Sequence, residues 1–123
     1  MKNQAYRMAM LFDFYGDLLT ERQREFYDLY YNEDLSLAEI AENYGISRQG
    51  VRDVIVRAEA AMTEIEDKTH IIRRFQQSRA AIEAINAAAD RLLQSIDGRS
   101  YSDAMLDEIA RTIKENVAKL EQE

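Results

Sequence analysis

The stretch "IAENYGISRQGVRDVI", residues 40–55, decides the fold of this chain because it places a glycine between two apolar-patterned segments. Glycine adopts a left-handed backbone without steric cost, so Gly45 predicts a tight turn. Ala41 lies four positions earlier, where a second helix crossing the first requires a small side chain. The apolar residues that would lock two such helices together stand at the matching offsets: Ile40, Tyr44, Ile46, Val51 and Val54. This spacing predicts a helix-turn-helix rather than two ordinary helices joined by a glycine turn.

The second helix of this motif carries a polar outward face with the chemistry of a nucleic-acid reader. Arginine can bind guanine O6 and N7 through two hydrogen bonds, and glutamine can do the same with adenine N6 and N7. A serine beside the free N–H groups of a helix start suits a phosphate. The candidate nucleic-acid-binding residues are therefore Ser47, Arg48, Gln49, Arg52 and, one turn further on, Arg57.

The charge distribution counts against tight DNA binding by one such unit. The formal net charge is -7, and residues 1–67 hold 14 acidic against 7 basic residues, whereas residues 68–123 hold 9 of each. Attraction to phosphate supplies most of the non-specific affinity of DNA-binding proteins. We therefore expect weak binding by one unit, which a dimer could strengthen by supplying two half-sites.

The whole chain is predicted to be all-α. It has no proline and only 4 glycines, and apolar residues recur at helical spacing. The expected helices cover about 4–16, 21–32, 37–43, 48–67, 70–96 and 103–121. The expected N-caps are Thr20, Ser36 (in a capping box with Glu39), Ser47 and Ser102. These ranges divide the chain into a helix-turn-helix domain, 1–67, and a C-terminal antiparallel helical hairpin, 68–123.

The hairpin is the expected oligomerisation element. Its first helix carries apolar or small residues at alternating steps of three and four, which is the pattern of a heptad seam: Phe75, Ser78, Ile82, Ile85, Ala89, Leu92 and Ile96. The seam can be covered within the hairpin or by another chain. Because two helices bury too little area to hold themselves together, the hairpin must pack on the N-terminal bundle or on another copy. We expect a homodimer.

Other residue patterns predict neither catalysis nor a cofactor. The chain has no cysteine and one histidine, His70, which we interpret as a surface residue at a helix start. No glycine-rich phosphate loop, Ser/His/Asp arrangement or metal-ligand spacing is present. The absence of cysteine fits a reducing cytoplasm. The first residues lack a secretory cleavage site, and no apolar run approaches the length of a membrane span.

A basic stretch lies beyond the helix-turn-helix and contains Lys68, Arg73, Arg74 and Arg79. One interpretation is a solvated face that balances the acidic half of the chain. The other is a secondary contact for RNA or for an acidic partner. The sequence leaves both open.

Residues 11–59 closely resemble the YlxM family of small bacterial proteins, which are encoded beside the genes of the signal recognition particle. The family's markers stand here as "AMLFDFYG", "LTERQR", "SLAEIAE" and "SRQ". The resemblance implies an all-helical protein whose helix-turn-helix is similar to the promoter-reading module of sigma factors. It also implies DNA binding through Ser47, Arg48, Gln49 and Arg52, and a regulatory role in the signal recognition particle pathway.

Two functions therefore stay open at this point. The first is a nucleic-acid-binding regulatory protein whose ligand is DNA or the RNA of the particle. The second is a protein-interaction module whose acidic helix-turn-helix surface docks on the particle's protein or on a ribosomal component without binding DNA. Neither requires an enzyme activity, a metal or a membrane.

Overall fold

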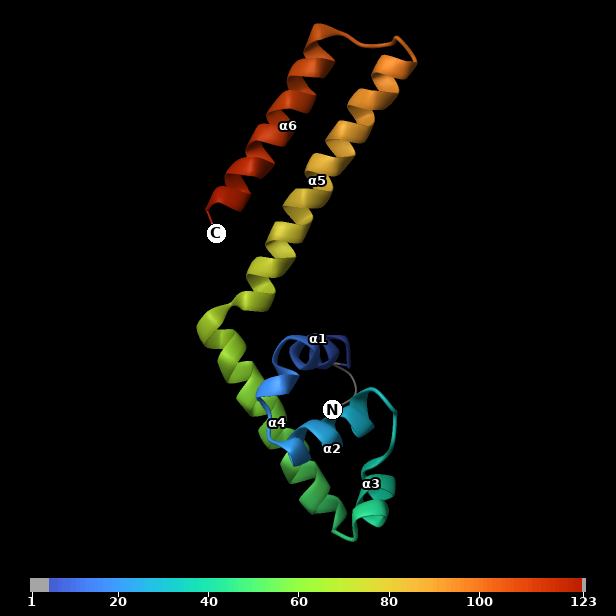
Figure 1. The fold of residues 1–123 in the computed structure, drawn as a ribbon, viewed down its shortest axis with the longest axis vertical. Coiled ribbons are helices and arrows are strands. Elements are labelled where there is room, and N and C mark those ends of the chain that lie inside the picture. Colours follow the sequence, from blue (N-terminus) through green and yellow to red (C-terminus); the bar gives the residue numbers. More distant parts are fainter. Residues whose placement is uncertain (1–4, 123) are drawn as a thin grey trace. The chain divides into compact units, whose positions relative to one another are not determined.

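The computed structural model describes residues 5–122, and throughout that range the only regular elements are helices (Figure 1). They are α1 (Ala5–Tyr15), the short 3-10 helix η2 (Gly16–Leu18), α2 (Glu21–Tyr31), α3 (Leu37–Tyr44), α4 (Arg48–Thr69), α5 (Ile71–Asp97) and α6 (Asp103–Glu121). The predicted all-α class is confirmed. The chain forms two compact units, the first ending at Ile72 and the second beginning at Arg73. Ile72, which the sequence assigned to the hairpin, is buried in the first unit.

The helix starts lie where the capping residues predict them. Thr20 and Ser36 each accept a hydrogen bond from the backbone N–H of the third residue of the following helix, and the side-chain oxygen of that residue accepts one from the cap's own N–H. Ser47 and Ser102 cap α4 and α6 in the simpler, one-way form. Each cap satisfies a backbone N–H that has no partner within the helix, so these polar side chains fix where the helices begin.

The turn between α3 and α4 has the geometry of a helix-turn-helix. Gly45 has a φ of 66°, in the left-handed region, and its N–H donates to the carbonyl oxygen of Ala41. The N–H of Ile46 donates to the same oxygen at 3.1 Å. Ala41 is buried, and both Ile40 and Val51 are fully enclosed. The small residue, the glycine and the apolar set thus perform the packing that their spacing predicts.

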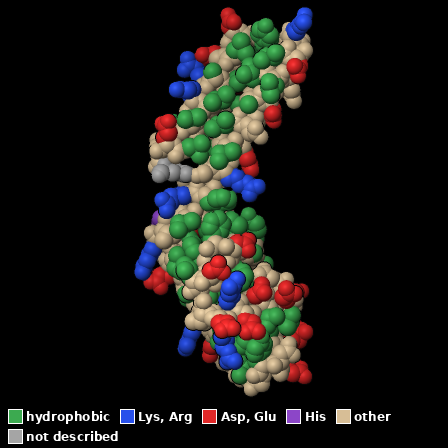
Figure 2. Space-filling view, in the orientation of Figure 1, with side chains coloured by type: hydrophobic (Ala, Val, Ile, Leu, Met, Phe, Trp, Pro, Cys, Tyr) green, Lys and Arg blue, Asp and Glu red, His purple; other side chains and the backbone are tan. Residues whose placement is uncertain are grey.

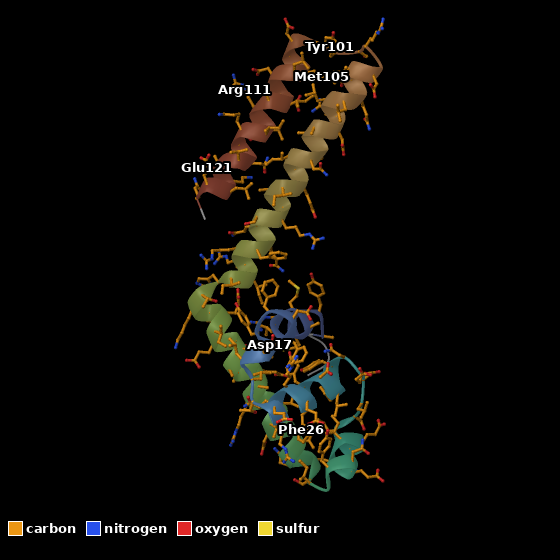
Figure 3. The ribbon with its side chains drawn as sticks, viewed as in Figure 1. Asp17, Phe26, Tyr101, Met105, Arg111 and Glu121 are labelled. Atoms are coloured by element: carbon orange, nitrogen blue, oxygen red, sulfur yellow. The ribbon has the colours of Figure 1, made fainter. Side chains whose placement is uncertain are left out.

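One core holds the first unit together, and α4 packs against α1, α2 and α3 to form it. Its largest enclosed side chains include Phe26, Tyr27, Ile55 and Met62, each with 0% exposure. Figure 3 shows Phe26 among the helices of this unit. Long amphipathic α4 therefore has two roles. One face of the helix lies in the core from Val51 to Met62, and the outward face of its first turns carries the exposed candidate residues.

Three tyrosine hydroxyls tie the helices of this unit to carboxylates on neighbouring helices. Tyr44 donates to Glu25, Tyr31 donates to Glu59, and Tyr15 donates to Glu66. Tyr15 is only 3% exposed, and Tyr31 and Tyr44 are half-buried. Three of the acidic residues that make this half so negative thus serve as structural hydrogen-bond acceptors.

These contacts predict a loss of stability in alkali. The pKa of Tyr15 and Tyr31 is raised, chiefly by burial and next by the bonded carboxylate, and that of Tyr44 is raised chiefly by its hydrogen bond to Glu25. A phenol whose pKa is higher in the folded chain stabilises that state at low pH, and the contribution is lost as pH rises above the unfolded value of about 10.

We therefore expect the free energy of unfolding in urea to fall steeply above about pH 10. Tyr31→Phe should make the fall shallower, because the variant has one phenol fewer to ionise. A flat profile, with phenolate absorbance appearing in chains that stay folded, would contradict the expectation.

A left-handed residue also separates α4 from α5. His70 has a φ of 54° and ends α4, and α5 begins at the next residue. The break near "EDKTH" is as predicted, but His70 is the C-cap of α4 rather than a residue at a helix start. The Glu66 carboxylate lies at this break, where it accepts from the N–H of Ile72 at 2.9 Å as well as from Tyr15. These bonds hold a conformation that non-glycine residues rarely adopt.

The hairpin packs on a different row of α5 from the predicted seam. The α5 side chains buried against α6 are Ala81, Ala88 and Ser95. Each precedes a seam residue by one position, so the contact is rotated by about 100° around the helix. The exposed fractions of Ile82 and Ile96 are 56% and 52%. The small residues face α6, which leaves part of the seam uncovered.

Candidate nucleic-acid interface

The start of α4 is built on Ser47, which is exposed and whose hydroxyl accepts a hydrogen bond from the N–H of Gly50 at 3.0 Å. A Cβ atom added to Gly50 would lie 3.2 Å from that hydroxyl oxygen. The glycine thus leaves room for the cap, although it costs the helix about 1 kcal/mol of propensity relative to alanine. Any phosphate at this helix start would meet a hydroxyl that already serves the backbone.

The three arginines of the candidate site are exposed. Arg48 and Arg52 lie one turn apart along one edge of the exposed face of α4, and Arg57 lies towards the other edge. None of the three forms an ion pair with a residue between positions 5 and 122. Their guanidinium groups are therefore available to an external anion.

Gln49 is engaged within α4. Its side-chain amide donates to the Asp53 carboxylate at 2.9 Å. The sequence predicts Gln49 on the outward face, and the pairing with Asp53 was not predicted. Their spacing of four residues is the signal that could have found it, since glutamine and aspartate at this distance bond along a helix. To read a base, Gln49 would have to exchange Asp53 for that base.

Exposed carboxylates lie on the helix that precedes α4 and on the segment before that helix. Glu39 and Glu42 lie on α3, and Glu33 lies in the loop between α2 and α3; all three are exposed. In a helix-turn-helix docked on a duplex the first helix crosses the phosphate backbone. The side chains of Glu39 and Glu42 would then meet phosphate with like charge, which weakens the attraction that the arginines supply.

The structure does not bring the secondary basic residues together as one surface. Lys68 belongs to the first unit and pairs with Glu64 at 2.9 Å. That pairing raises the pKa of Lys68 and lowers the pKa of Glu64. Arg79 pairs with Glu83 at 3.2 Å. Arg73, Arg74 and Arg79 occupy three different sides of α5, because each residue advances about 100° around a helix.

The described residues contain no cluster of three or more histidine, aspartate or glutamate side chains that could hold a metal ion. Among the same residues, no helix combines the length and apolar character that crossing a membrane requires.

The left-handed glycine turn, the buried contacts between α3 and α4 and the exposed start of α4 define a helix-turn-helix protein. The chain belongs to the UPF0122 family: residues 2–101 match the family's model, which is described as "Putative helix-turn-helix protein, YlxM / p13 like". The predicted membership of the YlxM family is confirmed.

Relatives in several bacteria are similar over most of this chain. A UPF0122 protein of Desulforamulus reducens is 49% identical over 82 residues, which cover 66% of this chain and 70% of the relative. One from Halalkalibacterium halodurans is 41% identical over 106 residues, covering 79% and 97%. One from Acetivibrio thermocellus is 46% identical over 101 residues, covering 81% and 82%.

Proposed function

We propose that this chain is a non-catalytic regulatory protein of the cytoplasm that binds nucleic acid through the start of α4. The observation that carries the proposal is the set of exposed arginines, Arg48, Arg52 and Arg57, which have no ion pair with any residue between 5 and 122. Three cations without an ion pair, on the helix that reads DNA in this motif, favour a phosphate or base as their ligand.

The proposed binding is weak and sensitive to salt. Each phosphate that a cation neutralises contributes about one unit to the slope of log affinity against log salt, so three arginines give a slope of about three at most. The carboxylates of Glu39 and Glu42 oppose it. Regulation by such a site requires either two units acting together or a nucleic acid held nearby by a partner.

We further propose the signal recognition particle pathway as the setting of this regulation, with the particle's RNA or a duplex DNA as ligand. The support for the pathway is the family resemblance. The support for nucleic acid is the arginine set.

A second candidate function is docking on a protein partner, and the exposed carboxylates favour it. Glu33, Glu39 and Glu42 give the helix-turn-helix unit an acidic surface that a basic partner would complement, such as the particle's protein or a ribosomal surface. In this second function the helix-turn-helix supplies a docking surface for the protein partner and does not read bases.

Replacing Arg48 and Arg52 together with alanine should abolish binding of nucleic acid. Each arginine is expected to contribute about 10- to 100-fold in affinity if it contacts a base or phosphate directly. The measurement is a mobility shift of labelled duplex DNA and of particle RNA over a series of salt concentrations. Binding should be strongest at low salt and absent in the double variant.

The control is the double variant Arg24→Ala and Arg111→Ala, which removes the same charge from exposed positions elsewhere. It should shift nucleic acid as the unaltered chain does. Equal losses in both double variants would mean that only total charge matters. Absence of any shift at low salt, together with nuclease-resistant capture of the purified particle protein, would reject nucleic-acid binding in favour of docking.

A further inference from the structure

The hairpin, α5 and α6, carries a continuous apolar face that its own two helices do not cover. The exposed members are Ile82, Leu93, Ile96 and Val117, with exposed fractions of 56%, 60%, 52% and 36%. Between them lie half-buried apolar residues of both helices: Ile85, Leu92, Leu106, Ile113 and Leu120. Figure 2 shows apolar side chains running along the hairpin with charged residues at the margins.

This apolar face lies on one side of the hairpin because of the helical period. On α5, Ile85 and Ile82 lie about 40° and 100° around the helix from Ala81, which faces α6. On α6, Ile113 and Val117 hold the same offsets from Ile109 and Asn116, which face α5. In an antiparallel pair, equal offsets turn to the same side. The large apolar residues of both helices therefore share a surface.

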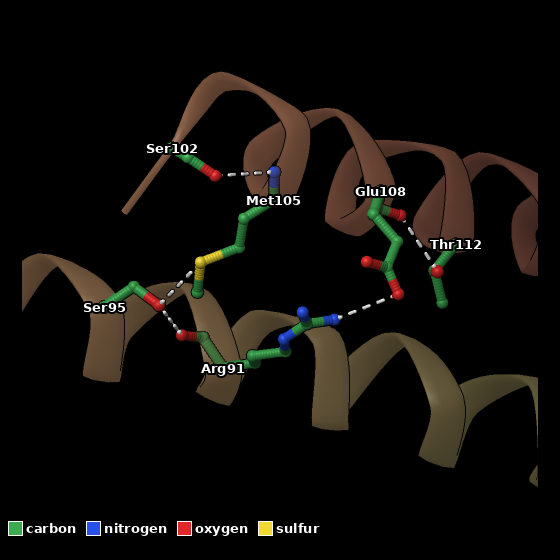
Figure 4. A network of polar contacts seen from close by, with 6 residues as sticks. All are labelled: Arg91, Ser95, Ser102, Met105, Glu108 and Thr112. Carbon is green, nitrogen blue, oxygen red and sulfur yellow. Dashed lines mark hydrogen bonds and ion pairs between the residues drawn. The ribbon is translucent and has the colours of Figure 1, made fainter. Parts of the chain in front are cut away.

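The opposite side of the hairpin carries polar contacts between the two helices and only small apolar side chains. Arg91 donates to Glu108 at 3.4 Å, and the hydroxyl of Ser95 contacts the sulfur of Met105 at 3.9 Å (Figure 4). A groove of about 710 Å³ lies further along, lined by Arg74, Lys119 and Asn116 among others. A partner that buries apolar surface would therefore use the first side.

We propose that a second copy of this chain covers the apolar face, so that two hairpins form an antiparallel four-helix bundle with a two-fold axis parallel to the helices. In that arrangement each α5 lies between its own α6 and the α6 of the other copy. The half-buried row, which includes Ile85, Leu92 and Ile113, then points to the bundle centre. The predicted seam of α5 is then covered on both sides. The row of Ala81 faces the α6 of the same copy, and the row of Ile82 faces the α6 of the other copy.

Most of the charges at the margin of the apolar face favour a second copy and this axis. The contacts of Arg91 with Glu108 and of Ser95 with Met105 fix which residues of α5 and α6 lie at the same level. A two-fold axis along the helices preserves these levels between copies. It therefore sets Arg79 of one copy opposite Glu121 of the other, on the margin of the apolar face. It also sets Lys114 between Glu83 and Asp90. One like-charge pair results, Asp97 opposite Asp103, at the end of the hairpin next to the turn.

The alternative two-fold axis, perpendicular to the helices, lays α5 against α5 and α6 against α6 in opposite directions. At every register it therefore separates Arg79 of one copy from Glu121 of the other. With Lys114 at the centre it also places Asp107 level with Glu121, and like charges placed opposite one another destabilise a helical interface. With the parallel axis, α5 begins at the same end of the bundle in both copies. The dimer does not depend on which ligand the helix-turn-helix unit binds.

The first test is the mass of the full-length chain by size-exclusion chromatography with light scattering, over a range of concentrations. We expect about twice the chain mass of 14.3 kDa. The double variant Ile82→Glu and Ile96→Glu should raise the dimer dissociation constant at least about a hundredfold, because it places charge in the apolar interface. The control, Ala80→Glu and Ala87→Glu, adds the same charge to exposed positions on the polar side of α5 and should remain dimeric.

The second test separates the arrangement from any folding defect by exchanging charges. Arg79→Glu alone and Glu121→Arg alone should each weaken the dimer about tenfold, since each places like charges together twice per dimer. An equimolar mixture of the two variants should form a heterodimer as tight as the unaltered dimer, because both contacts become attractive again.

A monomer of the unaltered chain at every concentration would overturn the proposal. So would a dimer that survives Ile82→Glu and Ile96→Glu unchanged. A dimer in which the charge-exchange mixture shows no recovery would overturn the parallel axis.

Discussion

Replacing Phe26 with alanine is expected to destabilise the helix-turn-helix unit by about 3–5 kcal/mol. The Phe26 side chain is 0% exposed, its ring meets the edge of the Tyr44 ring at 4.8 Å, and the Arg22 guanidinium lies 5.3 Å from its centre. It thus connects α2 to the first helix of the motif, and alanine would leave a cavity that rigid neighbours cannot fill. Since the free energy of unfolding of a small domain is only about 5–15 kcal/mol, the melting temperature should fall by about 15 °C or more.

The matched variant is Phe26→Leu, which keeps most of the volume and should cost less than about 1.5 kcal/mol. Tyr6→Ala provides a second comparison, because Tyr6 is 76% exposed and the change should be close to neutral. Thermal unfolding followed by circular dichroism measures all three. If Phe26→Ala melts at the same temperature as Phe26→Leu, then Phe26 does not hold the motif together in the way described.

The helix limits and the turn could be predicted from sequence because their causes are local. Thr20 and Ser36 each bond a backbone N–H only three residues away. Gly45 needs only its own lack of a side chain to reach a φ of 66°. Interactions between residues within one helical turn can be predicted from sequence, since they depend only on the type of a residue and of its near neighbours in the chain.

The rotation of α5 could not be predicted in the same way. Sequence favoured the row of Ile82 and Ile96 because a heptad pattern weights large apolar residues. The structure instead turns Ala81, Ala88 and Ser95 towards α6. Both rows belong to one apolar arc, and the choice between them depends on how closely α6 can approach. That distance is a property of two helices, so it cannot be read from one.

The candidate site shows the same division. Exposure of Arg48, Arg52 and Arg57 follows from helical periodicity and could be predicted. The engagement of Glu59 by Tyr31 joins residues 28 positions apart, and a net charge count treats that carboxylate as surface acid. Counting charges therefore describes the long-range field correctly, while it misses which carboxylates are held by structural contacts.

Replacing Glu66 with alanine is the second prediction of large effect, with an expected loss of about 2–4 kcal/mol. The carboxylate accepts from the Tyr15 hydroxyl and from the N–H of Ile72, and hydrogen bonds to charged groups are the stronger class. Without it, Tyr15, which is only 3% exposed, keeps Thr69 as a contact at 3.2 Å, while the N–H of Ile72 loses its acceptor at the break after His70. Urea unfolding measures the loss, and hydrogen exchange at the Ile72 amide should become faster.

Two variants at neighbouring or identical positions make this prediction specific. Glu66→Gln keeps an oxygen acceptor and should lose less than half as much. Glu64→Ala removes the same charge two residues earlier, where the carboxylate is exposed and meets only Lys68, and surface pairs of this kind contribute at most about 1 kcal/mol. If Glu64→Ala and Glu66→Ala prove equally costly, the loss reflects helix charge in general and not the acceptor at the break. If only Glu66→Ala is costly, this one carboxylate holds His70 in its left-handed conformation, and the break between α4 and α5 is a built feature of the chain.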